Sequence, residues 1–151
     1  MRRSDKKMEA KEAFQVLEEG MYGTLSTIGA DGYPYGVPLN YAVVDDCIYF
    51  HTATQGKKLD HIQYDDRVSF SVVTEVEVVP ELFSTHYACV ICFGRAAVVE
   101  DPDEKQRALE ALVHKYMPHL LKEGKEKIDK EFNMTGVVKV KIEHITGKKS
   151  Q

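Results

Sequence analysis

The sequence has few of the residues that mark secreted or membrane-spanning proteins. Its 151 residues include no tryptophan and only three cysteines, Cys47, Cys89 and Cys92. No apolar run approaches the roughly 18 residues that a membrane-spanning helix needs, so we expect no membrane association. The first residues lack the apolar segment of a secretory signal, and an odd number of cysteines is typical of free thiols in a reducing compartment. We therefore expect a cytoplasmic protein.

Concentrated positive charge is also missing. Lysine and arginine number 20 against 24 acidic residues, which gives a net charge of -4 at pH 7. The basic residues occur at most in pairs, so we predict no nucleic-acid partner. Hydrophobic residues make up 43% of the chain, enough for one domain over residues 1–151 whose core needs no disulfide.

Cys89 and Cys92 form a Cys-x-x-Cys pair that requires an interpretation. They lie in Tyr87-Ala-Cys-Val-Ile-Cys-Phe93, which is rich in β-branched and aromatic residues and is predicted to be a strand. Side chains three positions apart on a strand point to opposite faces, so these thiols are poorly placed to share a metal or form a disulfide. We interpret them as packing residues. The histidines show no metal-ligand spacing either, and we predict no metal site.

Hydrophobic periodicity alternates between strand and helix patterns along the chain. Helices are predicted at residues 8–19, 56–62, 102–117 and 119–132, and strands at 22–28, 35–44, 47–53, 67–73, 87–99 and 137–145. The stretch 75–86 contains a proline and three glutamates and is predicted to be a loop. Short turns between strands favour antiparallel pairing, so we predict an α+β, mainly β fold: a six-stranded antiparallel barrel with peripheral helices.

Three local signals refine this prediction. Pro38 cannot donate a ladder hydrogen bond, which indicates a sheet edge or a bulge in its strand. Gly94 indicates a bulge or a close backbone approach in the strand 87–99. Asp101 is the expected N-cap of the third helix, with Pro102 in its first turn and Glu104 reaching back as in a capping box.

The segment from residue 48 to residue 62 carries the clearest chemical signal. A strand ends near Ala53, a loop with Gly56 follows, and Lys57 and Lys58 begin a helix. Free backbone amides and the positive end of a helix dipole favour a phosphate, and two ammonium groups would strengthen its binding. A solvated helix start is the alternative, since lysine pairs are common on surfaces.

Several motifs in series resemble the nitroimidazole-resistance (Nim) family, within the pyridoxamine 5'-phosphate oxidase-like FMN-binding split barrels. They are Tyr22-Gly-Thr-Leu-Ser-Thr27, Asp31-Gly-Tyr-Pro-Tyr-Gly-Val-Pro-Leu-Asn-Tyr41, Ile48-Tyr-Phe-His-Thr-Ala53, Gly56-Lys-Lys-Leu59 and Cys92-Phe-Gly-Arg-Ala-Ala-Val-Val-Glu-Asp101. The resemblance extends from about residue 1 to residue 145. It implies a split β-barrel that binds FMN, in preference to FAD, between two copies of the chain.

The resemblance also implies which residues bind the cofactor. Lys57 and Lys58 would hold the phosphate, and two strand segments would contact the ribityl chain and the ring. These segments comprise Val37, Pro38, Leu39, Asn40 and Tyr41, and Phe50, His51, Thr52 and Ala53. The strand 87–99 of a facing subunit would complete the site of a homodimer.

His51 is the candidate catalytic residue. A lone histidine on a strand is more often a structural residue, but this one falls in a segment that lines the flavin in the family. An imidazole that titrates near neutral pH could hydrogen-bond the cofactor or protonate a reduced substrate. The other five histidines are interpreted as incidental.

Three functions compete at this point. The first is an FMN-dependent reductase of small planar electron-poor molecules such as 5-nitroimidazoles. No Gly-x-Gly-x-x-Gly motif for a resident dinucleotide is present, so the flavin would be reduced by NAD(P)H that binds transiently or by a protein donor. The second is a non-catalytic flavin- or haem-binding protein that stores or senses its cofactor. The third is a barrel that has lost cofactor binding, which the lysine pair argues against. Vitamin B6 oxidation is not expected, since the tryptophan- and arginine-rich C-terminal segment of the oxidase is missing.

Overall fold

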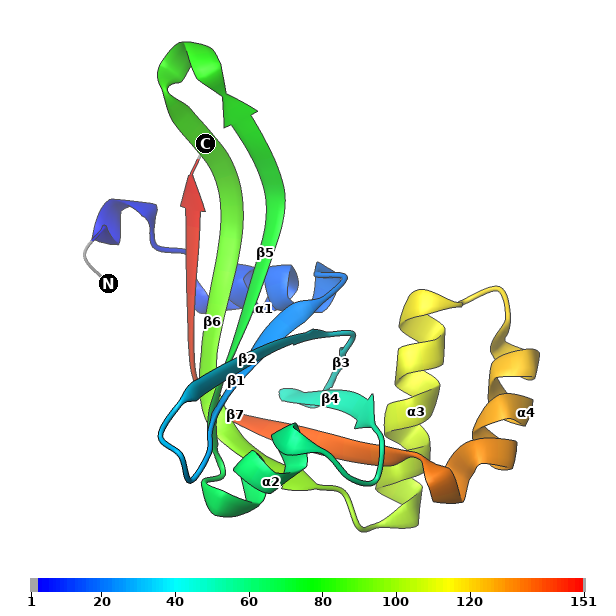
Figure 1. The fold of residues 1–151 in the computed structure, drawn as a ribbon. Coiled ribbons are helices and arrows are strands. Elements are labelled where there is room, and N and C mark those ends of the chain that lie inside the picture. Colours follow the sequence, from blue (N-terminus) through cyan, green and yellow to red (C-terminus); the bar gives the residue numbers. More distant parts are fainter. Residues whose placement is uncertain (1–2, 151) are drawn as a thin grey trace.

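The computed structural model describes residues 3–150 and contains one antiparallel sheet that curls into a half-open barrel (Figure 1). Its seven strands follow the order β2-β1-β5-β6-β7-β4-β3. They are β1 (Gly23–Ile28), β2 (Pro34–Leu39), β3 (Ala42–Val44), β4 (Cys47–Thr52), β5 (Arg67–Val79), β6 (Ser84–Val98) and β7 (Gly136–Ser150). The antiparallel barrel with peripheral helices is confirmed.

Four α-helices flank the sheet. They are α1 (Ala10–Glu19), α2 (Lys57–Tyr64), α3 (Pro102–Tyr116) and α4 (Leu121–Glu131), with short 3-10 turns at Ser4–Lys6, Pro80–Leu82 and Phe132–Met134. All four predicted helices are therefore present, with small shifts at their ends. The α3–α4 pair lies on the side of the molecule where β4 and the start of β7 run (Figure 1).

The predicted count of six strands is wrong because the strand expected at 35–44 divides at Asn40 and Tyr41. Its first half, β2, pairs with β1, whereas its second half, β3, pairs with β4 at the opposite edge of the sheet. The apolar alternation continues through the break, so nothing in the pattern indicated it. The break arises because the chain leaves one edge of the curled sheet and joins the other.

The predicted loop at 75–86 is also wrong. β5 and β6 continue as a hairpin that projects beyond the rest of the sheet (Figure 1), and we call residues 75–86 the arm. Glu75 has a positive φ of 54° where the β5–β6 register shifts. Alternating Val76 and Val78 are 63% and 68% exposed, so this strand has no buried face. The strand expected at 137–145 likewise extends to Ser150, pairing with Tyr87.

Two apolar clusters stabilise the fold on either side of the sheet. The cluster inside the barrel includes Leu25, Phe50, Phe70 and Val90, and α1 covers it with Leu17. The second cluster fills the space between the sheet and the helices α3 and α4, and its members include Tyr49, Leu109, Leu112, Ile128 and Val137. β4 contributes to both clusters, since successive strand side chains point to opposite faces.

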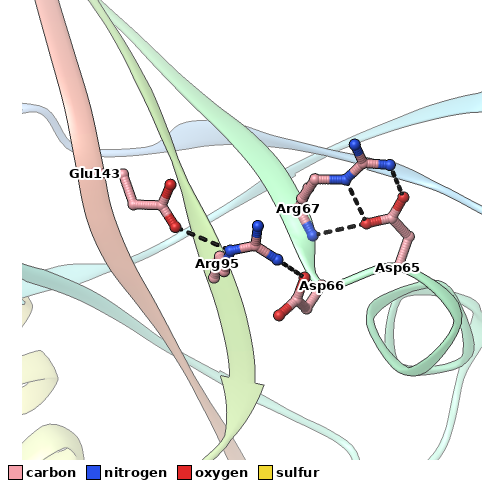
Figure 2. Close-up of polar contacts among 5 residues, drawn as sticks. All are labelled: Asp65, Asp66, Arg67, Arg95 and Glu143. Atoms are coloured by element: carbon pink, nitrogen blue, oxygen red, sulfur yellow. Dashed lines mark hydrogen bonds and ion pairs between the residues drawn. The ribbon is translucent and has the colours of Figure 1, made fainter.

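The bulge predicted at Gly94 is confirmed. The β6–β7 register shifts between Phe93 and Gly94, and a Cβ at Gly94 would collide with the carbonyl oxygen of Lys141. Next to it, Arg95 bonds Asp66 at 2.6 Å and Glu143 at 3.0 Å, which ties three chain segments together (Figure 2).

The cap predicted for α3 is confirmed in one half. The Asp101 carboxylate accepts from the Glu104 backbone N–H at 2.9 Å. Glu104 does not reach back to close a capping box. Its carboxylate instead accepts from the Tyr49 hydroxyl at 2.7 Å and from Lys139 Nζ at 2.6 Å, because these partners offer charge and a second donor.

Candidate functional site

The barrel is left open between β2 and the end of β4. β2 forms one edge of the sheet, so its outer side has no neighbouring strand in the described structure. β3 pairs with β4 only at Cys47–Tyr49, so Phe50 to Thr52 pair with β7 on one side alone. Both segments that the resemblance assigns to the flavin thus have backbone groups facing the opening. The edge position of Pro38 is confirmed.

The start of α2 adjoins this opening. Four residues, 53–56, connect the end of β4 to α2. Gly56 is the N-cap, with φ 141° and ψ 165°, a conformation that side chains rarely adopt, and an added Cβ would lie in open space. The carbonyl of Gly56 accepts from Leu59 and Asp60. The first amides of the helix, at Lys57 and Lys58, have no intrahelical acceptor.

Tyr35 and His61 hold α2 against the sheet, and sequence reasoning missed both. His61 is buried, and its Nδ1 lies 3.0 Å from the Thr27 hydroxyl. Tyr35 packs edge-on against the His61 ring at 5.4 Å, and Lys57 Nζ lies 4.9 Å from the Tyr35 ring centroid. This stack places the ammonium of Lys57 over β2. The histidine was interpreted as incidental, but its ring positions the helix.

The predicted cofactor residues differ in accessibility. Val37 and Leu39 are half-buried and pack against the barrel core, whereas Pro38 and Ala53 are exposed. Tyr41 and Phe50 have no exposed surface. Neither of these two residues therefore offers surface to a ligand in the opening, and the Tyr41 N–H already donates to the Tyr116 hydroxyl.

The Thr52 hydroxyl is one of two buried side-chain polar atoms without a hydrogen-bond partner between residues 3 and 150. The other is Lys115 Nζ, which lies 3.9 Å from the centroid of the Tyr41 ring. Burial lowers the pKa of Lys115 to about 8. Thr52 is the last residue of β4, so its unpartnered hydroxyl lies at the strand end that leads into α2.

Asn40 and His51 are brought together although eleven positions separate them. Both line a cleft of about 530 Å³ between the sheet and the α3–α4 pair. His51 is exposed and shares the face of β4 that carries Tyr49 toward these helices. The Asn40 amide donates to the Met21 carbonyl at 3.1 Å, which fixes its orientation.

Tyr116 on α3 fastens the helix to the same corner. Its hydroxyl accepts from the Tyr41 N–H at 3.0 Å and donates to the Met21 carbonyl at 2.7 Å. The sequence pattern placed Tyr116 near the end of the helix predicted at 102–117 and indicated no further role for it. The structure shows that it joins α3 to the point where β2 gives way to β3.

The thiols behave as packing residues. Cys92 is buried in the barrel and burial raises the pKa of its thiol to about 12, while Cys89 lies on the other face and is half-buried. All three cysteines are free. Across residues 3–150, no three His, Cys, Asp or Glu side chains gather as metal ligands would. Within the same span, no helix is both long and apolar enough to cross a membrane.

Comparison with known proteins agrees with this architecture. The pyridoxamine 5'-phosphate oxidase family model matches residues 9–149. No curated protein matches the sequence. A conserved hypothetical protein from Mycobacterium tuberculosis is 26% identical with a TM-score of 0.84, covering 97% of this chain and 88% of that one.

Two further solved structures share the fold. A candidate 5-nitroimidazole antibiotic resistance protein from Bacteroides thetaiotaomicron has 22% identity and a TM-score of 0.80, over 94% of this chain and 85% of that one. An FAD- and haem-binding protein from Mycobacterium smegmatis has 24% identity and a TM-score of 0.81, over 97% and 74%. With the family model covering nearly the whole sequence, the chain belongs to the pyridoxamine 5'-phosphate oxidase family.

Proposed function

We propose that the protein is a flavoprotein that binds FMN in the opening between β2 and β4 and uses it to reduce small, planar, electron-poor molecules. One observation supports this most. The same opening is bordered by the free edge of β2, the one-sided end of β4 and the start of α2 with its two lysines. The contact of Lys57 with the Tyr35 ring links the start of α2 to β2.

The donor set suits a flavin mononucleotide. A phosphate monoester needs positive charge and amide donors, which Lys57, Lys58 and the first amides of α2 supply. The ribityl hydroxyls need polar partners along the way, and the unpartnered Thr52 hydroxyl and the one-sided end of β4 provide them. The open space around Gly56 lets a phosphate approach the backbone. FMN is favoured over FAD because the site has one cationic corner.

A second copy of the chain is the proposed partner. The outward face of β6 carries Ile91 and Phe93, which are 42% and 53% exposed, next to Val73 of β5 at 57%. Apolar surface of this kind is typical of an interface between subunits. In a homodimer this face of β6 would cover the flavin of the facing subunit.

The bound flavin would supply hydride or electrons, and the chain would position the substrate and supply a proton. His51 is the residue suited to the proton step, because it is exposed in the cleft and its imidazole N–H can face a ligand there. Asn40 is held by Met21 and can orient a polar substituent through its free amide oxygen.

The absorbance spectrum of the purified protein tests cofactor identity directly. A flavin spectrum, with release of FMN on denaturation, is the expected result, and a haem spectrum or no chromophore would contradict it. Anaerobic NADH or NADPH with a nitroimidazole should then bleach the nitro absorbance. Reduced flavin without loss of the nitro absorbance would instead indicate a non-catalytic flavin-binding protein.

A double variant tests the phosphate corner. Lys57→Ala with Lys58→Ala should abolish FMN retention, because both ammonium groups next to the phosphate are lost. Lys122→Ala with Lys130→Ala removes the same charge from exposed positions on α4 and should keep the flavin. Equal retention in both double variants would place the phosphate elsewhere.

A further inference from the structure

The cleft beside His51 has its own character, distinct from the phosphate corner. Its walls come from α3 and α4, and they are mostly apolar. The main contributors are Leu109, Leu112, Tyr116, Met117, Leu120 and Ile128. At about 530 Å³ it has the size usual for small-molecule sites, which are generally apolar with a few placed polar groups.

Most polar groups of the cleft come from the sheet and from α4. Asn40 and His51 reach it from the sheet, and Glu123, Lys127 and Glu131 border it on α4. Lys127 Nζ contacts Glu131 at 2.6 Å, so the single ammonium of the cleft is already paired. Among residues 3–150, no lysine or arginine of the cleft is therefore left unpaired for a phosphate or carboxylate of a substrate, and His51 faces the reacting end.

We propose that this cleft binds the apolar body of an uncharged substrate, whose reducible polar group meets His51 and Asn40. The inference rests on the proposed function and names its substrate class: neutral molecules with an extended aromatic or hydrocarbon part, and not phosphorylated or carboxylated ones. Burying such a body between the sheet and the α3–α4 pair supplies the affinity, while the two polar side chains orient the reacting end.

The test compares two probes that share one aromatic frame. N-phenylnaphthylamine is neutral, and anilinonaphthalene sulfonate carries an anionic group on the same rings. Equilibrium dialysis against the protein as purified should show binding of the neutral probe and at least about tenfold weaker binding of the sulfonate, in line with the discrimination that single pocket contacts provide. Equal binding, or preference for the sulfonate, would overturn the inference.

Neighbouring leucines provide a matched pair of variants. Leu120 lines the cleft and is 39% exposed, whereas Leu121 is 48% exposed and faces the other side of the helix pair. Leu120→Trp should weaken binding of the neutral probe about tenfold by filling the cleft, and Leu121→Trp should leave it unchanged. Equal affinities in the two variants would show that the probe binds elsewhere.

A gain-of-function variant tests the charge argument. Met117→Lys places an unpaired ammonium in the cleft at the end of α3, where Met117 is 42% exposed. It should raise affinity for the sulfonate, and unchanged sulfonate binding would contradict the proposal. Flavin content separates the two proposals: loss of FMN in Leu120→Trp would assign the cleft to the flavin ring and overturn the inference alone. A chromophore-free protein that still binds the neutral probe would overturn only the proposed function.

Discussion

Replacing Gly56 by alanine should weaken FMN binding although it changes none of the side chains proposed to contact the ligand. Gly56 has φ 141° and ψ 165°, a region that is essentially restricted to glycine. An alanine there costs about 1–3 kcal/mol, and a Cβ would meet nothing within 4 Å, so the cost is one of backbone conformation alone. Because residues 53–56 are exposed, the free protein can relax the strain by moving this loop.

Relaxation moves the amides of Lys57 and Lys58 away from their positions, and the bound state must restore them. The strain then appears in the dissociation constant, and about 1.4 kcal/mol corresponds to a tenfold change. We expect Gly56→Ala to raise the FMN dissociation constant roughly tenfold, with less than about 1 kcal/mol lost from the unfolding free energy of the flavin-free protein. Flavin fluorescence titration and urea denaturation measure the two quantities.

Gly32 offers the matched control. It lies in the turn between β1 and β2, has φ 76°, and a Cβ there also meets nothing within 4 Å. Gly32→Ala should cost about 1 kcal/mol of stability and leave FMN affinity unchanged. The reasoning would be refuted if both variants bound FMN like the wild type, or if both weakened it equally.

Three further predictions concern the scaffold. Gly94→Ala forces a Cβ against the Lys141 carbonyl on a neighbouring strand that cannot move aside, and should lower the unfolding free energy in urea by about 2 kcal/mol or more. His61→Ala removes a buried ring and its hydrogen bond, and should cost about 2–3 kcal/mol and also weaken FMN binding, whereas unchanged affinity would show that α2 keeps its place without the ring. The pKa of Glu104 is lowered, first by its hydrogen bond with Lys139. The stabilisation from this pair is complete above the usual carboxyl pKa and is lost as pH falls through the lowered pKa of the folded state. Lys139→Met should therefore have a lower unfolding free energy than wild type at neutral pH, and the two values should converge in acid. A difference in unfolding free energy that stays constant with pH would contradict this.

Local patterns were sufficient wherever an element buries one side against the core. The cap of α3 at Asp101 was predicted because it depends on neighbouring residues alone, and the bulge in β6 was predicted because the glycine at position 94 marks it in the sequence. The arm was not predicted, because Val76 and Val78 alternate with glutamates on a hairpin exposed on both faces, a pattern that also fits a loop. Strand formation there depends on pairing across the hairpin and not on burial.

The site could be predicted in parts but not as an assembly. Lys57 and Lys58 were proposed as phosphate ligands because they share one helix start, and Asn40 and His51 were proposed as site residues because each lies in a motif. The cleft that joins the latter pair depends on how α3 packs against α4 and the sheet, which no spacing in the sequence encodes. The support of Lys57 by Tyr35 likewise follows only from the position of β2 beside α2.

The prolines of β2 explain how an open barrel can leave this edge free for a ligand. Pro34 pairs with Ile28, Gly36 with Ser26 and Pro38 with Thr24. Since proline cannot donate to a ladder, these alternate residues must occupy the positions whose backbone groups point away from β1 and into the opening. The outer edge of β2 therefore presents the carbonyls of all three residues but only one amide, that of Gly36. Another strand would find too few donors to pair with, which protects the edge from aggregation. A ligand rich in hydroxyl and N–H donors, as a flavin is along its ribityl chain and pyrimidine ring, meets a row of acceptors.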